Sequence, residues 1–195
     1  MEINVERDLK NILIKKLELD TYLEIVKYVQ GDGKITGDSD EAKNFRKMYN
    51  AYFRVRRNEN WQNKYYEFME ANRKNKDLTF DEIIGYLKEN CKTKNENGCV
   101  EASFSSKLLA VINTSCPIWD IIVLKNLDLK LYSNKGIDEA IEGYKKLRDI
   151  YTEFINSEKG KEELEKFKEY FRDCYSKIDD ISDTKIVDCL IWGKG

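Results

Sequence analysis

A lysine and an aspartate on either side of the chain's only proline could form a reactive pair. Lys107 lies in the helical pattern "SFSSKLLAVIN", and Asp120 follows Pro117 in "PIWDIIV". An unprotonated lysine amine attacks electrophilic carbon and forms Schiff bases, and a nearby carboxylate stabilises the cation that develops. Two plainer roles stay open: a surface lysine whose stem packs on apolar neighbours, and an aspartate that only caps the helix beginning at "IIV".

The composition is that of a folded chain with no dominant charge. Of the 195 residues, 41% are hydrophobic and 12% aromatic, enough to bury the core of one compact domain. The 34 basic and 36 acidic residues leave a net charge of −2. No overall field attracts a polyanion, so any nucleic-acid site must be a local patch.

The missing residue types exclude several kinds of site. The chain has no histidine, which removes histidine triads, histidine general bases and histidine metal sites. Its five cysteines form no C-x-x-C pair, and "MEINVERDLK" contains no apolar signal region. We therefore predict a cytoplasmic protein with reduced thiols, no metal and no cofactor. No apolar run reaches the ~18 residues of a membrane span.

The spacing of apolar residues predicts an all-α protein. One proline, 10 glycines and recurrent apolar positions three and four residues apart predict about nine or ten helices and no strand. "TFDE" is a capping box, with Thr79 as cap and Glu82 reaching back, and Ser182 is placed to cap the last helix. We predict one compact domain over residues 1–195, with a division into two small lobes at 1–90 and 91–195.

Two further segments were candidates for ligand binding. "GDGKIT" resembles a calcium loop, but the loop register places no acidic ligand at its first, third or twelfth position, so we interpret it as a solvated turn. Residues 41–57 carry six basic residues and one acidic residue. They could bind phosphates between stacking tyrosines, or pair with acids of the C-terminal third. The six are Lys43, Arg46, Lys47, Arg54, Arg56 and Arg57.

Together, the lysine helix and "PIWDIIV" resemble the helix-hairpin-helix DNA glycosylase superfamily. There, a glycine-containing hairpin leads into a helix with a nucleophilic lysine, and a P-[VI]-x-D segment follows. Lys107 and Asp120 match these two residues. Ser103 and Ser105 stand where the hairpin has glycines that bind a phosphate. With "YFRVRRNENW" and "TKIVDCLIW", the same segments resemble a set of small bacterial proteins of unassigned activity that share this fold by inference.

The resemblance implies a DNA-repair glycosylase or glycosylase/lyase that acts on damaged DNA. A flipped nucleotide would enter a pocket, where Lys107 attacks the sugar C1′ and Asp120 stabilises the cationic sugar. Trp119 would stack on the flipped base. The expected nucleic-acid contacts are Arg46, Arg54, Arg56, Arg57, Ser103 and Ser105. The alternative is a non-catalytic all-helical module that binds a protein or nucleic acid, which the absent glycines and the pI of about 5.5 favour.

Overall fold

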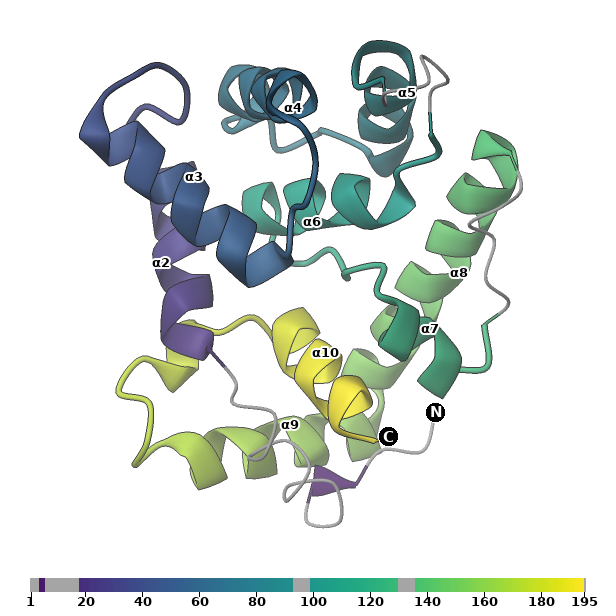
Figure 1. Ribbon diagram of the computed structural model, residues 1–195. Helices are drawn as coiled ribbons and strands as arrows, with labels where there is room; N and C mark the ends of the chain where they lie inside the picture. The colour runs from purple at the N-terminus through teal and green to yellow at the C-terminus, as the bar shows by residue number, and fades with distance from the viewer. Residues whose placement is uncertain (1–3, 6–17, 93–98, 130–135, 195) are drawn as a thin grey trace.

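A computed structural model describes residues 4–5, 18–92, 99–129 and 136–194. Within these ranges the chain forms nine α-helices and one short 3-10 helix and no strand, which confirms the all-α prediction (Figure 1). The α-helices are α2 (Leu19–Gln30), α3 (Asp40–Phe53), α4 (Glu59–Asn72), α5 (Phe80–Asn90), α6 (Ala102–Ile112), α7 (Ile121–Asn126), α8 (Ile137–Asn156), α9 (Glu158–Phe171) and α10 (Asp183–Gly193); the 3-10 helix is η1 (Ile178–Asp180).

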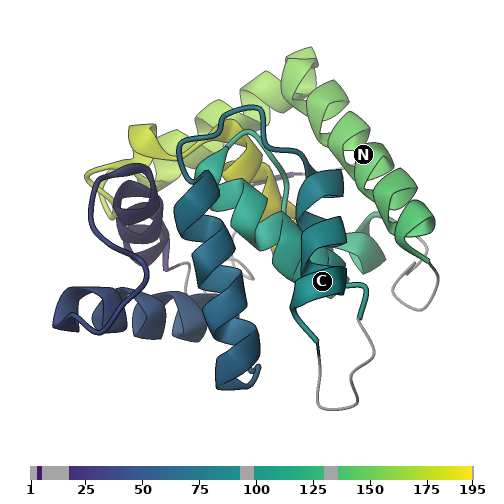
Figure 2. The same ribbon diagram turned by 90° about the horizontal axis from the view of Figure 1, so that it is seen from above.

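Helices α6 and α10 lie at the centre of the molecule (Figure 1). Helix α6 packs against α2 and α5, and α10 packs against α7, α8 and α9. Seen from above, α6 runs between α4 and α5 (Figure 2). Eight of the 11 residues of α6, and eight of the 11 of α10, are buried. The charged residues on these two helices therefore have mostly buried neighbours.

The buried side chains form one continuous hydrophobic cluster. It includes residues of every α-helix from α2 to α10, and α5 packs on α6 across the lobe boundary that we placed at residues 90 and 91. The division into lobes stays a prediction. No helix in the described ranges is long and apolar enough to cross a membrane.

Capping side chains fix where the helices begin. Thr79 and Glu82 form the predicted capping box, with the Thr79 amide donating to Glu82 Oε2 at 2.8 Å. The Ser182 hydroxyl accepts from the Lys185 amide at 3.2 Å, as predicted for the last helix. Each cap satisfies an amide that has no partner within its own helix, which typically contributes about 1 kcal/mol.

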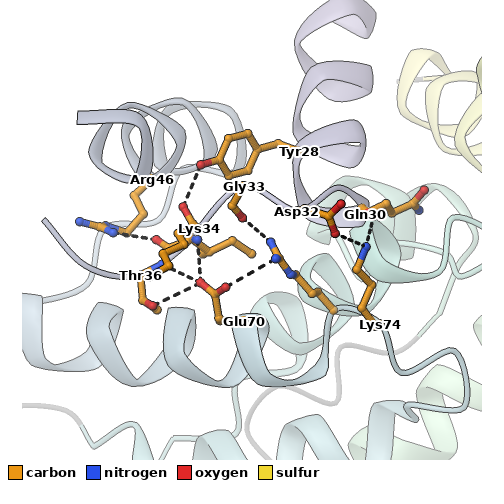
Figure 3. A network of polar contacts seen from close by, with 11 residues as sticks. Tyr28, Gln30, Asp32, Gly33, Lys34, Thr36, Arg46, Glu70 and Lys74 are labelled. Carbon is orange, nitrogen blue, oxygen red and sulfur yellow. Dashed lines mark hydrogen bonds and ion pairs between the residues drawn. The ribbon is translucent and has the colours of Figure 1, made fainter. Parts of the chain in front are cut away.

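The segment that resembled a calcium loop is anchored by the protein's own side chains (Figure 3). Glu70 of α4 accepts from the Ile35 amide at 2.6 Å and from the Thr36 amide at 2.9 Å. Although partial burial opposes it, these two hydrogen bonds hold the pKa of Glu70 below its ordinary value. The carboxylate that accepts from the loop amides therefore belongs to α4 and not to the loop itself.

The carbonyl oxygens of the same loop accept from basic side chains. Arg46 donates to Ile35 O at 2.7 Å and Gly37 O at 2.9 Å, and Lys74 donates to Gln30 O at 2.7 Å (Figure 3). Arg73 donates to Gly33 O in the same way. Arg46, which we expected to contact phosphate, therefore binds the loop backbone through its guanidinium.

Two glycines should respond in opposite ways to alanine. A Cβ on Gly160 would overlap the carbonyl of Phe154 at the α8–α9 junction, whereas a Cβ on Gly85 would meet nothing within 4 Å. We expect Gly160→Ala to lower the free energy of unfolding by about 2–3 kcal/mol. Gly85→Ala should raise it by about 0.5–1 kcal/mol, because alanine favours the helical backbone. Urea unfolding would measure both, and equal effects would contradict the packing at the junction.

Candidate active site

Lys107 is enclosed by α6 and the end of α3. Its Nζ donates to the carbonyl oxygen of Phe53 at 3.1 Å and lies 5.1 Å from the centre of the Phe104 ring. Burial lowers the pKa of Lys107; Asp120 opposes this shift and Arg54 adds to it. A lysine with a lowered pKa has more of its amine unprotonated at neutral pH, as a nucleophile requires.

Asp120 caps α7, as the sequence predicted. Its Oδ1 accepts from the amide of Ile122 at 2.8 Å, and its backbone is extended. No ion pair of 4.0 Å or less joins it to Lys107, although its charge affects the pKa of that amine. The Lys107 amine therefore remains available for a substrate atom while the carboxylate acts on it from a distance.

The connector at residues 113–120, which carries Asp120, runs between α6 and α10 (Figure 1). Side chains of α6, α8 and the N-terminal part of α10 bind its backbone. In chain order the contacts are Ser182 Oγ to Thr114 O (2.8 Å), Thr184 Oγ1 to Ser115 O (3.2 Å), Tyr144 Oη to Pro117 O (2.9 Å), the Ile118 amide to the Asp188 carboxylate, and the Trp119 amide to Ser106 Oγ (2.8 Å). Because these contacts satisfy backbone groups at five of its residues, the connector holds Asp120 in place.

Lys107 and Asp120 open into the same cavity. Its volume is about 440 Å³, and its walls come from the start of α2, the end of α3, α6, α7 and α10. This size lies in the range of small-molecule and cofactor sites. Six charged residues line it: Glu18, Arg54, Lys107, Asp120, Lys185 and Asp188. Charges of both signs therefore face one cavity, which is open to solvent beside the exposed residues Glu18, Arg54 and Ile121.

Sequence reasoning missed Lys185 and Asp188. Asp188 is 6% exposed, and its Oδ1 accepts from the Tyr151 hydroxyl at 2.6 Å. Burial raises its pKa to about 6, although Lys185, Tyr151 and the Ile118 amide all act to lower it. One signal was present: Lys185 and Asp188 interrupt the apolar run of "TKIVDCLIW", and a charged residue inside a buried helix commonly marks a site.

Because the pKa of Asp188 is raised, the difference in unfolding free energy between the wild type and Asp188→Asn should depend on pH. Between the ordinary value of 3.8 and about 6, the folded protein keeps a proton that the unfolded chain has released. Wild-type stability relative to Asp188→Asn should therefore fall by about 2–3 kcal/mol as the pH rises from ~4 to ~6, and then stay level. Urea unfolding of both proteins across this range would measure it. A difference that does not change with pH would contradict the assignment.

Arg57, a predicted phosphate contact, is partly exposed and pairs with a buried carboxylate of the protein. Its Nε and Nη2 donate to the two carboxylate oxygens of Glu101 at 3.1 and 2.9 Å, and Glu101 is only 5% exposed. The guanidinium also lies 5.1 Å from the centre of the Phe104 ring. Of the four arginines that we expected at phosphates, Arg54 and Arg56 are the two with exposed side chains, and Arg54 also lines the cavity.

Trp119, Ser103 and Ser105 lie in positions that differ from those expected for contacts with a base or a phosphate. Trp119 is 4% exposed and does not line the cavity, so its ring packs in the core instead of facing a base. Ser105 is fully buried, and its hydroxyl donates to Glu101 O at 2.9 Å within α6. Ser103 lies in the first turn of the same helix, and its carbonyl accepts from the Ser106 hydroxyl at 2.9 Å. The helix thus occupies the place of the glycine hairpin.

Comparisons with protein-family models, with curated proteins and with solved structures found no match in any of the three. The described residues also hold no group of three or more cysteine, aspartate or glutamate side chains that could bind a metal ion. The cavity cysteine, Cys189, is a poor nucleophile because burial raises the pKa of its thiol to about 11. The strongest nucleophile candidate in the cavity is the Lys107 amine.

Proposed function

We propose that the protein is a DNA-repair-type glycosylase or glycosylase/lyase in which Lys107 is the nucleophile. One observation carries the proposal: the enclosed Lys107 amine and the Asp120 carboxylate line a single cavity of about 440 Å³. The order of the two residues along the chain, with Pro117 between them, matches the glycosylase motif described above. Burial of the amine supplies the lowered pKa that the chemistry needs.

The reaction begins with a nucleotide flipped out of the duplex into the cavity, at a cost of a few kcal/mol. The lone pair of Lys107 Nζ forms a bond to the sugar C1′. The bond between C1′ and the base nitrogen breaks, its electron pair leaves with the base, and the base takes up the proton that the amine releases. Opening of the C1′–O4′ bond, with a proton passing to O4′, then gives a protonated Schiff base on Lys107.

Asp120 acts by its charge. Positive charge develops on the sugar as the base leaves, and a fixed carboxylate in a partly enclosed site stabilises it. The hydrogen bond from the Ile122 amide and the anchored connector keep the carboxylate in position. Outside the cavity, Lys47 on α3 and Arg56 in the segment that follows it have exposed side chains, and we assign contacts with the DNA backbone to them.

Borohydride trapping tests the proposal. Wild-type protein and Lys107→Gln would be incubated with duplexes that carry oxidised, deaminated or abasic sites, and the Schiff base reduced to a stable adduct. We expect the wild type alone to form an adduct on at least one damaged base. Equal trapping by both proteins would contradict Lys107 as nucleophile. No trapping, combined with DNA binding at low salt, would favour the non-catalytic binding module instead.

A further inference from the structure

Lys185 is a second lysine in the cavity, and its ammonium group forms no ion pair with any residue that the structure describes. It lies on α10, where its Nζ is 4.8 Å from the centre of the Tyr22 ring and 5.9 Å from that of Tyr52. No carboxylate oxygen in the described part of the chain lies within 4.0 Å of it. Its partners are the two aromatic rings, the hydroxyl of Tyr52 and the more distant charge of Asp188.

Lys185 is partly buried, and a cation that loses solvent without gaining a paired anion is costly in a folded protein. Aromatic faces offset part of the cost. The nearest carboxylate on the same helix, Asp188, is already bound by the Tyr151 hydroxyl and the Ile118 amide. Despite burial, the neighbouring groups hold the pKa of Lys185 above its ordinary value, so the group stays cationic. An anionic ligand in the cavity would supply the paired anion that the Lys185 ammonium group lacks.

The two lysines differ in what they can do. Lys107 has a lowered pKa, whereas Lys185 keeps its proton. Arg54 adds a permanently charged guanidinium to the cavity lining, and it has no ion pair among the residues that the structure describes. One wall of the cavity thus supplies a nucleophile, and other walls supply two cations that cannot act as nucleophiles.

We infer that Lys185, together with Arg54, binds the phosphate of the sugar whose C1′ Lys107 attacks. This inference rests on the proposed function and specifies its substrate as a 2-deoxyribose phosphate ester. Three carboxylates also line the cavity. Asp120 and Asp188 repel a phosphate less than free carboxylates would, because their oxygens accept from the Ile122 amide, the Ile118 amide and the Tyr151 hydroxyl. Glu18 is exposed, so solvent screens its charge. Lys185 is a binding residue here, and Lys107 remains the one that forms the covalent bond.

Inorganic phosphate tests the anion site without any lysine chemistry. Thermal unfolding would be followed with phosphate and with chloride at matched ionic strength. We expect phosphate to raise the wild-type Tm by about 3 °C or more at ten times its Kd. Lys185→Gln should lose this rise. Lys194→Gln should keep it, because that exposed lysine is the C-cap residue of the same helix and does not line the cavity. No specific rise in the wild type would overturn the inference.

A pair of free sugars tests the link to Lys107. Borohydride would be added to protein with 2-deoxyribose 5-phosphate or 2-deoxyribose, and the adduct measured by intact mass. We expect the wild type to trap the phosphorylated sugar at about 100-fold lower concentration, since two charge-assisted contacts form. Lys185→Gln should trap both sugars alike, and Lys107→Gln neither.

The outcomes separate the two proposals. Equal trapping of both sugars by the wild type would overturn the phosphate inference and leave the Lys107 nucleophile standing. Trapping of neither sugar, nor of damaged DNA, would overturn the nucleophile, and the thermal measurement would still decide whether Lys185 holds an anion. A free sugar phosphate that is trapped far better than an abasic duplex would identify the small molecule, and not DNA, as the source of the phosphate.

Discussion

Exchanging Asp120 for asparagine should slow Schiff-base trapping by about 100-fold or more, with little change in thermal stability. Asparagine caps a helix about as well as aspartate does, because its amide oxygen can accept from the Ile122 amide in the same way. The substitution therefore removes the charge and keeps the cap. Single-turnover trapping of a damaged duplex would measure the rate, and thermal unfolding the stability.

Two controls make this result specific. Asp120→Ala removes both the charge and the cap, so it should slow trapping by a similar factor and also cost about 1 kcal/mol of stability. Lys125→Gln removes a charge from the last turn of the same short helix, outside the cavity lining, and should leave the trapping rate unchanged. If Asp120→Asn reacted at the wild-type rate, Asp120 would be a helix cap and nothing more.

Replacing Arg57 with alanine should lower the free energy of unfolding by about 3 kcal/mol. The loss leaves the Glu101 carboxylate, 5% exposed, without the guanidinium that binds both of its oxygens. The side chain of Arg57 is itself 36% exposed, so the expected cost lies at the lower end for a buried ion pair. Urea unfolding at neutral pH would measure the change.

The neighbouring arginine is the matched control. Arg56→Ala removes the same charge from an exposed position next along the chain, and its effect should stay within about 0.5 kcal/mol. Combining Arg57→Met with Glu101→Leu should recover most of the lost stability, because no unpaired charge then remains inside. Equal effects of Arg56→Ala and Arg57→Ala would show that the pair with Glu101 contributes little.

Local patterns in the sequence were enough to predict the helices and several of their ends. The apolar periodicity, the Thr79–Glu82 capping box and the caps at Asp120 and Ser182 are all found in the structure. These features depend on contacts between residues two to four apart, which a sequence displays directly. Lys107 and Asp120 line one cavity, and the roles that the glycosylase resemblance implies for them stay a prediction.

The partners of the arginines could not be predicted in the same way. Arg46 and Arg57 belong to a basic run, which gave no indication that each would bind groups in a particular loop or helix. Arg57 meets Glu101, 44 residues further along the chain, only because α6 packs beside the end of α3 and the start of α4. Asp188 meets Tyr151 and Ile118 for the same kind of reason. Pairings of this kind follow from the packing of helices, which no short segment encodes.

The walls of the cavity come from distant parts of the chain, between Glu18 and Trp192. During synthesis, Lys107 and Asp120 leave the ribosome well before α10 does, at about 5–20 residues per second. Until α10 has formed, the connector lacks its contacts with Ser182, Thr184 and Asp188, and the lysine has no enclosed pocket. Until then the nascent chain displays an ordinary, protonated lysine, because the burial that lowers the pKa of Lys107 is not yet in place.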